Sequence, residues 1–212
     1  MSTVNSLSGG HRTTVVLIDD DELLASALAS VLRAAHFNVR SYDQAQSYLD
    51  AYEPSEPGCV VSDIRMPGMD GLSLQAHLNK RGAINPLIFI TSHADVTMAV
   101  HAMREGAFDF LEKPVDDQRL IGSVQRALEV DQTNRSRLAV VEDISRRFDA
   151  LTRREREVLN LMADGKPNKL IAAELNIAER TVEYHRASLM EKTDAPSLAH
   201  LLRMKLELER HR

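Results

Sequence analysis

The stretch CVVSDIRMPGMDG, residues 59–71, decides the fold of this chain. A short apolar run leads directly into one acid, Asp63, and a loop rich in Pro, Gly and Asp follows it. Such a run is typical of a buried strand, and open α/β sheets carry their sites at the carboxyl ends of their strands. We therefore expect Asp63 to be a candidate for chemistry. The alternative is that it only caps the turn after the strand.

Length and composition favour two domains in a cytoplasmic protein. The chain has 212 residues, of which 43% are hydrophobic, whereas one domain typically holds roughly 100 to 150. No apolar run approaches the ~20 residues of a membrane span, and no signal peptide opens the sequence, so we expect no membrane partner. The only cysteine, Cys59, excludes a disulfide framework and a multi-thiolate metal site.

The charge is distributed unevenly along the chain. The net charge is −5, but residues 1–150 carry 14 basic and 21 acidic side chains, whereas residues 151–212 carry 12 and 10. An acidic first part and a slightly basic last part fit two domains with different partners. The polar segment 1–13 is expected to be a disordered tail.

Five short apolar runs alternate with five helical patterns between residue 14 and about residue 130. The expected strands are 15–18, 38–42, 59–63, 86–90 and 107–111, and helices are expected around 24–32, at 43–51, 72–79 and 95–104, and from about 116. This alternation predicts an α/β domain with a parallel, doubly wound sheet and helices on both of its faces.

Parallel strands present their carboxyl ends at one edge of the sheet. This edge would bring together Asp19, Asp20, Asp63, Thr91 and Lys113. Neighbouring carboxylates repel each other, and Mg²⁺, which takes oxygen ligands, would relieve that repulsion. A nucleophilic carboxylate could then accept a phosphoryl group whose oxygens meet the metal, the ammonium and the hydroxyl.

These residues resemble the receiver domain of two-component response regulators. VVSDIRMPGMDG at residues 60–71 and FLEKP at residues 110–114 resemble the FixJ branch in particular. The resemblance covers residues 14–130 and implies a five-stranded, flavodoxin-like and CheY-like fold. It implies that Asp63 accepts a phosphoryl group from a sensor histidine kinase. It also implies that Mg²⁺ is held by Asp19, Asp20, Asp63 and the backbone carbonyl of Arg65.

The same resemblance gives roles to the residues around the acids. Lys113 would pair with the acids or the phosphoryl group, and Thr91 would bond a phosphoryl oxygen. Phe110 would change rotamer together with Thr91, although a plain core ring is the alternative. Arg65 and His93 stand where the family tunes the lifetime of the phosphoryl group.

Three local features complete the first domain. Asp21 is expected to cap a helix rather than bind the metal, and the Lys113–Pro114 bond is expected to be cis. The helix at 95–104 carries a second apolar stripe. By resemblance, Val100 and Arg104 face a second receiver in a homodimer formed on phosphorylation. Tolerance of exposed apolar groups is the alternative.

Residues 131–147 contain no Gly or Pro and predict a helical linker. Leu138, Val141 and Ile144 would form its apolar stripe, with a flexible polar tether as the alternative. A capping box, Thr152 to Glu155, then starts a helix that ends at Gly165. Helices capped by Asn168 and covering 179–193 are joined by a tight turn, as in a helix-turn-helix, and a last helix starts at Pro196-Ser197.

LTRREREVL at residues 151–159 and NKLIAAELNIAERTVEYHR at residues 168–186 resemble the LuxR-type DNA-binding domain. The resemblance implies an all-α domain of four helices at 148–212 that binds double-stranded DNA. Val182 and Leu189 would face its core. Glu183, Tyr184 and Ala187 would enter the major groove, and the residues that resemble phosphate contacts are Lys169, Thr181, Arg186 and Lys192. Glu183 replaces the basic residue of many relatives, but a carboxylate can accept a hydrogen bond from cytosine N4.

The combination predicts a phosphorylation-activated transcription regulator, with no enzymatic activity beyond its own phosphoryl transfer and dephosphorylation. One alternative is a haloacid-dehalogenase-like phosphatase, but that family has a second aspartate where this chain has Arg65. Another is a receiver that signals through protein contacts alone, with a last domain that binds only proteins.

Overall fold

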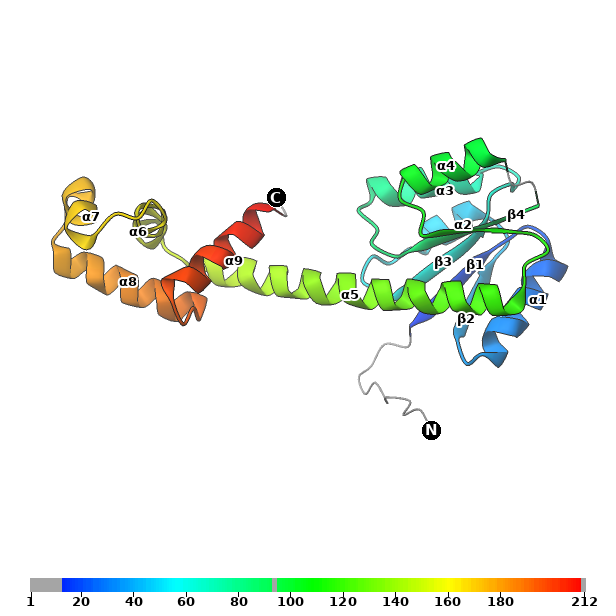
Figure 1. The fold of residues 1–212 in the computed structure, drawn as a ribbon, viewed down its shortest axis with the longest axis horizontal. Coiled ribbons are helices and arrows are strands. Elements are labelled where there is room, and N and C mark those ends of the chain that lie inside the picture. The colour runs from blue at the N-terminus through cyan, green and yellow to red at the C-terminus, as the bar shows by residue number, and fades with distance from the viewer. Residues whose placement is uncertain (1–12, 93–94, 211–212) are drawn as a thin grey trace. The chain divides into compact units, whose positions relative to one another are not determined.

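The computed structural model describes residues 13–92 and 95–210 (Figure 1). The predicted tail, apart from Thr13, and His93 lie outside the described residues. The chain divides into two compact units, and the boundary falls between Arg135 and Ser136. None of the described helices has the length and apolar character that crossing a membrane requires.

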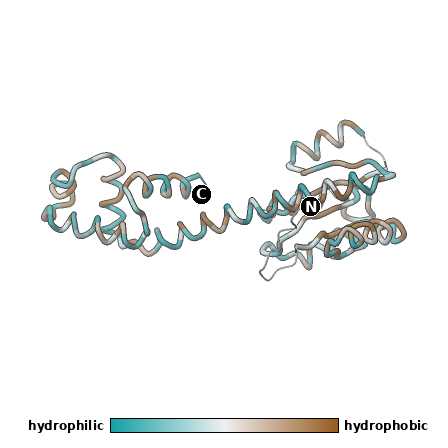
Figure 2. Tube along the Cα trace, turned by 60° about the horizontal axis from the view of Figure 1, so that its bottom comes forward, coloured by the Kyte–Doolittle hydropathy of each residue, from teal (hydrophilic) through white to brown (hydrophobic). Residues whose placement is uncertain are grey.

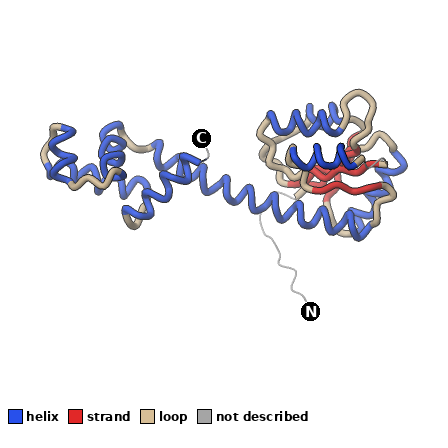
Figure 3. The backbone as a smooth tube through the Cα atoms, turned by 45° about the horizontal axis from the view of Figure 1, so that its top comes forward, coloured by secondary structure: helices blue, strands red, loops and turns tan. Residues whose placement is uncertain are grey.

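The first unit is built on a five-stranded parallel sheet with the strand order β2-β1-β3-β4-β5. The strands are β1 Thr14–Ile18, β2 Asn38–Tyr42, β3 Gly58–Asp63, β4 Leu87–Thr91 and β5 Asp109–Glu112. The helices are α1 Glu22–Ala34, α2 Ala45–Asp50, α3 Gly71–Lys80, α4 Val96–Arg104 and α5 Asp117–Asp149. Helices lie on both sides of the strands (Figure 3), so the predicted doubly wound α/β fold is confirmed.

Alternating side chains of each central strand serve two separate cores. On β1, Val15 and Leu17 pack with α1 and α5, whereas Val16 and Ile18 pack on the opposite face with α2 and α3. A strand that is buried on both faces needs apolar residues at every position, because successive side chains point to opposite sides. This explains the continuous apolar runs of β1 and β3.

The fifth strand begins at Asp109, two residues later than predicted. The backbone leaves α4 through Gly106, whose φ is 93°, and the N–H of Ala107 still bonds to the carbonyl of Ala102. Ala107 is therefore part of the turn that closes α4 and not of the strand, because a left-handed glycine and a back-directed hydrogen bond terminate a helix.

The helix α5 is continuous over 33 residues and contains the whole segment predicted as a linker. Its first turns pack in the first unit through Leu120 and Val124, and its last turns pack in the second unit through Ile144 and Phe148. Of the predicted apolar stripe, Ile144 is buried and Val141 is half-buried, whereas Leu138 is 37% exposed. Among the described residues, the core of the second unit reaches along this helix to Val141.

The second unit contains the end of α5 followed by α6 Arg153–Ala163, α7 Asn168–Leu175, α8 Glu179–Thr193 and α9 Leu198–Arg210. Figure 2 shows apolar residues alternating with polar ones along these helices, as expected for helices that share one core. The predicted capping box of Thr152 and Glu155 is present. Asn168 does not cap α7 as predicted, because Pro167 occupies the cap position and Asn168 is already helical.

Candidate functional sites

The carboxyl edge of the sheet gathers a cluster of acids. Asp19 follows β1 directly, and Asp63 is the last residue of β3. One carboxylate oxygen from each of Asp19, Asp20 and Asp63 lies within 4.8 Å of the other two. Asp19 and Asp63 are buried and Asp20 is exposed, so the cluster is open to solvent on one side.

Lys113 supplies a cation to this cluster. Its Nζ lies 2.9 Å from Asp19 Oδ2 and 2.5 Å from Asp63 Oδ2. The backbone N–H of Lys113 donates to the carbonyl of Thr91 at 2.8 Å, and the Lys113–Pro114 bond is cis. The loop after β5 is therefore joined to the end of β4, and this connection directs the ammonium towards both acids.

The electrostatics of the cluster favour a divalent cation. Burial raises the pKa of Asp19, and the hydrogen bond from Lys113 offsets only part of this effect. Burial acts to lower the pKa of Lys113, but its hydrogen bonds to Asp19 and Asp63 outweigh burial and raise it. The ammonium of Lys113 contacts two carboxylates, and a third, that of Asp20, lies beside them. An all-oxygen donor set of this kind fits Mg²⁺, which is commonly bound through one or two carboxylates together with phosphate oxygens and water.

Asp21 stands apart from the cluster although it is its neighbour in sequence. Its Oδ1 accepts hydrogen bonds from the N–H groups of Leu23 and Leu24, at 3.0 and 3.1 Å, and thereby caps α1. Its own N–H donates to Asp19 Oδ1 at 3.0 Å. The side chain of Asp21 is therefore occupied by the helix, as the sequence predicted.

The residues expected to respond to a phosphoryl group lie in the loop after β3, at the end of β4 and on β5. The N–H of Arg65 donates to Asp63 Oδ1 at 3.1 Å, while the Arg65 side chain is exposed. Thr91 is buried at the end of β4. Phe110 is half-buried against the core that contains α2, α3 and α4.

Sequence reasoning missed Asp109, which joins β5 to α5. Its Oδ1 accepts a hydrogen bond from the N–H of Phe110, and its Oδ2 accepts hydrogen bonds from Ser123 and Arg126 of α5.

The helix α4 is attached weakly along its length and firmly at its end. Ala102 is its only buried residue, whereas Val96, Val100 and Met103 are 77%, 43% and 46% exposed. Arg104, the second residue of the expected dimer face, is exposed as well.

Two amides of α3 hold the carboxyl end of α4. Gln75 donates to the carbonyl of Ala102 at 3.0 Å, and Asn79 donates to the carbonyl of Glu105 at 2.9 Å. Sequence reasoning missed both. Gln75 interrupts an apolar helix face, and this interruption was the available signal.

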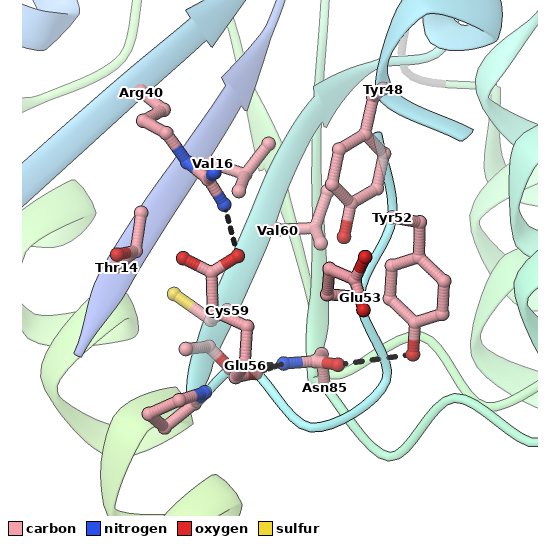
Figure 4. A pocket seen from close by; sticks show the side chains of 12 residues that line it. Thr14, Val16, Arg40, Tyr48, Tyr52, Glu53, Glu56, Cys59, Val60 and Asn85 are labelled. Atoms are coloured by element: carbon pink, nitrogen blue, oxygen red, sulfur yellow. Dashed lines mark hydrogen bonds and ion pairs between the residues drawn. The ribbon is translucent and has the colours of Figure 1, made fainter. Parts of the chain in front are cut away.

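A small pocket lies at the opposite edge of the sheet (Figure 4). It holds only about 10 Å³, barely the space of one water molecule. Two pairs of its polar groups bond to each other: Arg40 with Glu56, and Tyr52 Oη with Asn85 Oδ1 at 3.3 Å. The three acids and the ammonium described above lie at the carboxyl edge instead.

The second unit presents one face of α8 to solvent. Val182 and Leu189 are completely buried and fix the rotation of the helix, while Glu183, Tyr184 and Ala187 are exposed. Arg180 is exposed too, and sequence reasoning missed it. It stands four residues before Tyr184 and seven before Ala187, and this helical spacing could have revealed it.

Two of the expected phosphate contacts also hold the domain together. Arg186 donates to Asn168 Oδ1 at 2.6 Å and joins α8 to α7. Lys192 Nζ lies 2.8 Å from Oε2 of Glu155, a buried residue in the first turn of α6. Of the other two, Lys169 is exposed and Thr181 is half-buried.

Glu155 is the buried anchor of this domain. Burial alone would raise its pKa, but hydrogen bonds from Lys192, Ser188 and the N–H and hydroxyl of Thr152 outweigh burial and lower the pKa to about 2. The carboxylate is therefore charged over the whole physiological range. It ties the start of α6 to the last turns of α8.

Comparison with known proteins matches each unit to one family. Residues 15–125 match the response regulator receiver domain, and residues 149–205 match the bacterial regulatory proteins of the luxR family. The chain is 42% identical over 195 residues to the transcriptional regulatory protein FixJ of Bradyrhizobium diazoefficiens, covering 92% of this chain and 94% of FixJ. It is 35% identical to the response regulator protein TodT of Pseudomonas putida, covering 92% and 86% of the two chains.

Solved structures agree with these matches over nearly the whole chain. The response regulator StyR superposes with a TM-score of 0.83 at 39% identity, covering 92% of this chain and 99% of StyR. Full-length FixJ from B. japonicum gives a TM-score of 0.58 at 39% identity, covering 95% and 99%.

Proposed function

Since the chain belongs to the response regulators that join a receiver domain to a LuxR-type DNA-binding domain, we propose that Asp63 is the residue whose phosphorylation activates it. The family makes the protein a phosphorylation-activated transcription regulator of a two-component system rather than a classical enzyme, and the predicted function is confirmed at this level. Membership of this family argues against both alternatives, a phosphatase and a receiver without DNA binding.

The observation that carries the proposal is the position of Asp63 between two other carboxylates and Lys113. A carboxylate oxygen of Asp63 attacks the phosphorus of the kinase phosphohistidine; the O–P bond forms as the N–P bond breaks, and the imidazole leaves. Lys113 then moves its contact from the acid to a phosphoryl oxygen, and the Thr91 hydroxyl donates to another. Mg²⁺, held by Asp19, Asp20, Asp63 and the carbonyl of Arg65, would neutralise the charge of the phosphoryl oxygens.

The residues around the site fit a signal that starts at the phosphoryl group. Movement of Thr91 gives the ring of Phe110, which is only half-buried, room to follow. The receiver would then pair with a second copy through Val100 and Arg104 of α4. Slow attack of water on the acyl phosphate, a reaction of the receiver alone, would end the signal. We place these events in the cytoplasm, where the kinase domain and DNA are both accessible.

The DNA-binding unit acts through α8. Glu183, Tyr184 and Ala187 lie in the major groove, as expected for the second helix of a helix-turn-helix. Lys169, Thr181, Arg186 and Lys192 contact phosphates. For Arg186 and Lys192 this role is combined with the contacts to Asn168 and Glu155, which hold their side chains in place.

Intact-mass measurement after treatment with acetyl phosphate and Mg²⁺ tests the phosphoacceptor. Wild type should gain one phosphoryl group, and Asp63→Asn should gain none, because an amide is not a nucleophile. Asp21→Asn is the matched control: it makes the same chemical change two residues from Asp19, and asparagine can still cap α1. It should be labelled like wild type. A phosphoryl adduct on Asp63→Asn would refute the assignment.

A further inference from the structure

The acids of the second unit differ in whether they have a cation. From Arg153 to Arg210 every residue is described, and most acids there form ion pairs: Glu155, Glu157, Glu174, Asp194, Glu207 and Glu209. Within this described stretch the acids without an ion pair are Asp164, Glu179, Glu183 and Glu191, and three of them lie on α8. The helix that faces DNA thus carries most of the unneutralised carboxylates.

The position of Glu183 on α8 distinguishes it from Glu191, which lies in the last turns of the helix. Buried Val182 fixes the rotation of the helix, and Glu183 then lies beside Arg180 and Ala187, three residues after the first and four before the second. Its neighbour Tyr184 is 69% exposed. Glu183 therefore belongs to the exposed surface of the first half of α8, the half that reads bases in helix-turn-helix proteins.

A carboxylate at this surface weakens DNA binding unless it meets a hydrogen-bond donor. The phosphates are negative and repel it. Among base edges in the major groove, guanine presents only acceptors, thymine presents an acceptor and a methyl group, and adenine presents a donor next to the acceptor N7. Cytosine presents its N4 amino group without an acceptor of its own beside it, so cytosine is the base that suits Glu183 best.

We propose that Glu183 is a specificity-determining residue that accepts a hydrogen bond from the N4 amino group of one cytosine in each DNA half-site. The carboxylate rejects the other bases because each would set an acceptor or an apolar group against it. This inference rests on DNA binding by the second unit and adds the base that it selects.

The test selects binding sites from randomised duplex DNA with the full-length protein. Wild type should select a cytosine at one fixed position of each half-site, and Glu183→Ala should lose the preference at that position alone. Glu183→Gln should shift it towards adenine, whose N6 and N7 suit an amide. Glu191→Gln is the matched control: it removes the same charge near the end of the same helix, and it should leave the selected sequence unchanged.

A double-mutant cycle on the selected site measures the contact. Changing the C·G pair to T·A should weaken wild-type binding by about tenfold, equivalent to about 1.4 kcal/mol, and should not weaken binding by Glu183→Ala. Both Glu183 variants should bind random DNA more tightly than wild type because a repelling charge is gone. If Glu183 only stabilised the fold of α8, its substitution would instead weaken binding to the selected site and to random DNA alike.

The outcomes of these experiments distinguish a failure of this inference from a failure of the proposed DNA binding. Retention of the same base preference by Glu183→Ala overturns the inference and leaves DNA binding intact. A wild-type protein that retards no duplex at all overturns both. Weaker binding of Glu183→Ala to every sequence also overturns the inference, because the residue would then act on the fold of α8 rather than on a base.

Discussion

The carboxylate of Asp131 accepts a hydrogen bond of 2.9 Å from the backbone N–H of Gly58, so the middle of α5 is tied to the first residue of β3. The far end of this strand is Asp63. Arg135 Nε contacts both carboxylate oxygens of Asp131, and its guanidinium also donates to carbonyls of residues 54–56. These contacts make residues 131–135 part of the first unit.

Asp131→Ala should destabilise the first unit. The N–H of Gly58 would stay buried without its partner, which costs about 1–3 kcal/mol. Hydrogen exchange of the β3 amides at several urea concentrations measures this loss, and Glu129→Ala, an exposed acid on the same helix, is the control. Equal protection of β3 in both variants would show that the contact does not stabilise the strand.

The contrast between Asp63 and Asp131 shows what sequence could predict. Asp63 follows an apolar run, and strand ends collect at one edge of a parallel sheet, so a local pattern and one rule of topology predict its neighbours. The same reasoning placed Asp19, Thr91 and Lys113. Asp131 bonds to a backbone group 73 residues away, and every residue but proline offers such a group. No local pattern identifies that partner.

The same limit applies to the two anchors of α4. Gln75 and Asn79 reach carbonyls 27 and 26 residues away, and only the packing of α3 against α4 selects those carbonyls. Two helix starts, by contrast, followed from local chemistry: the cap at Asp21 and the capping box at Thr152.

Asp20→Ala should weaken Mg²⁺ binding more than Asp21→Ala. The Asp20 carboxylate lies in the cluster, whereas that of Asp21 is occupied by the N–H groups of Leu23 and Leu24. Asp21→Ala should instead cost about 1 kcal/mol of stability through the lost cap. Calorimetric titration with Mg²⁺ gives the affinities, and thermal unfolding gives the stabilities. Equal losses of affinity in the two variants would mean that Asp21 is a ligand.

Glu155→Gln should destabilise the DNA-binding unit in a manner that depends on pH. The folded pKa of Glu155, about 2, lies below its ordinary value of 4.5. A lowered pKa contributes stability that is present above pH 4.5 and is lost as the pH falls through about 2. The difference in unfolding free energy between wild type and Glu155→Gln should therefore be largest at neutral pH and shrink across this window.

Urea unfolding at a series of pH values measures that difference. Glu157→Gln is the control, because Glu157 pairs with Arg153 and Arg154 at the surface, and such pairs contribute little. A stability difference for Glu155→Gln that does not change with pH would show that the charge of Glu155 is not what stabilises the unit.

Val100→Asp should prevent pairing of the phosphorylated protein. The exposed apolar residues of α4 offer a surface that a second receiver can cover, whereas an acid there would have to be buried without a partner. Pairing must favour the phosphorylated state over the other, because a contact of equal strength in both states shifts no equilibrium. Sedimentation after acetyl phosphate treatment should show a dimer for wild type and for Val140→Asp, a matched change at an exposed valine of α5, and a monomer for Val100→Asp.

Pairing should also change how the protein binds DNA. Two linked recognition helices reach half-sites about one DNA turn, ~34 Å, apart, and linkage raises affinity without any new base contact. The dimer should show a steeper salt dependence than one module, since each neutralised phosphate adds roughly 0.9 to the slope. A phosphorylated protein that stays monomeric and still binds an inverted repeat more tightly would exclude pairing. Phosphorylation would then act by releasing an inhibited DNA-binding domain.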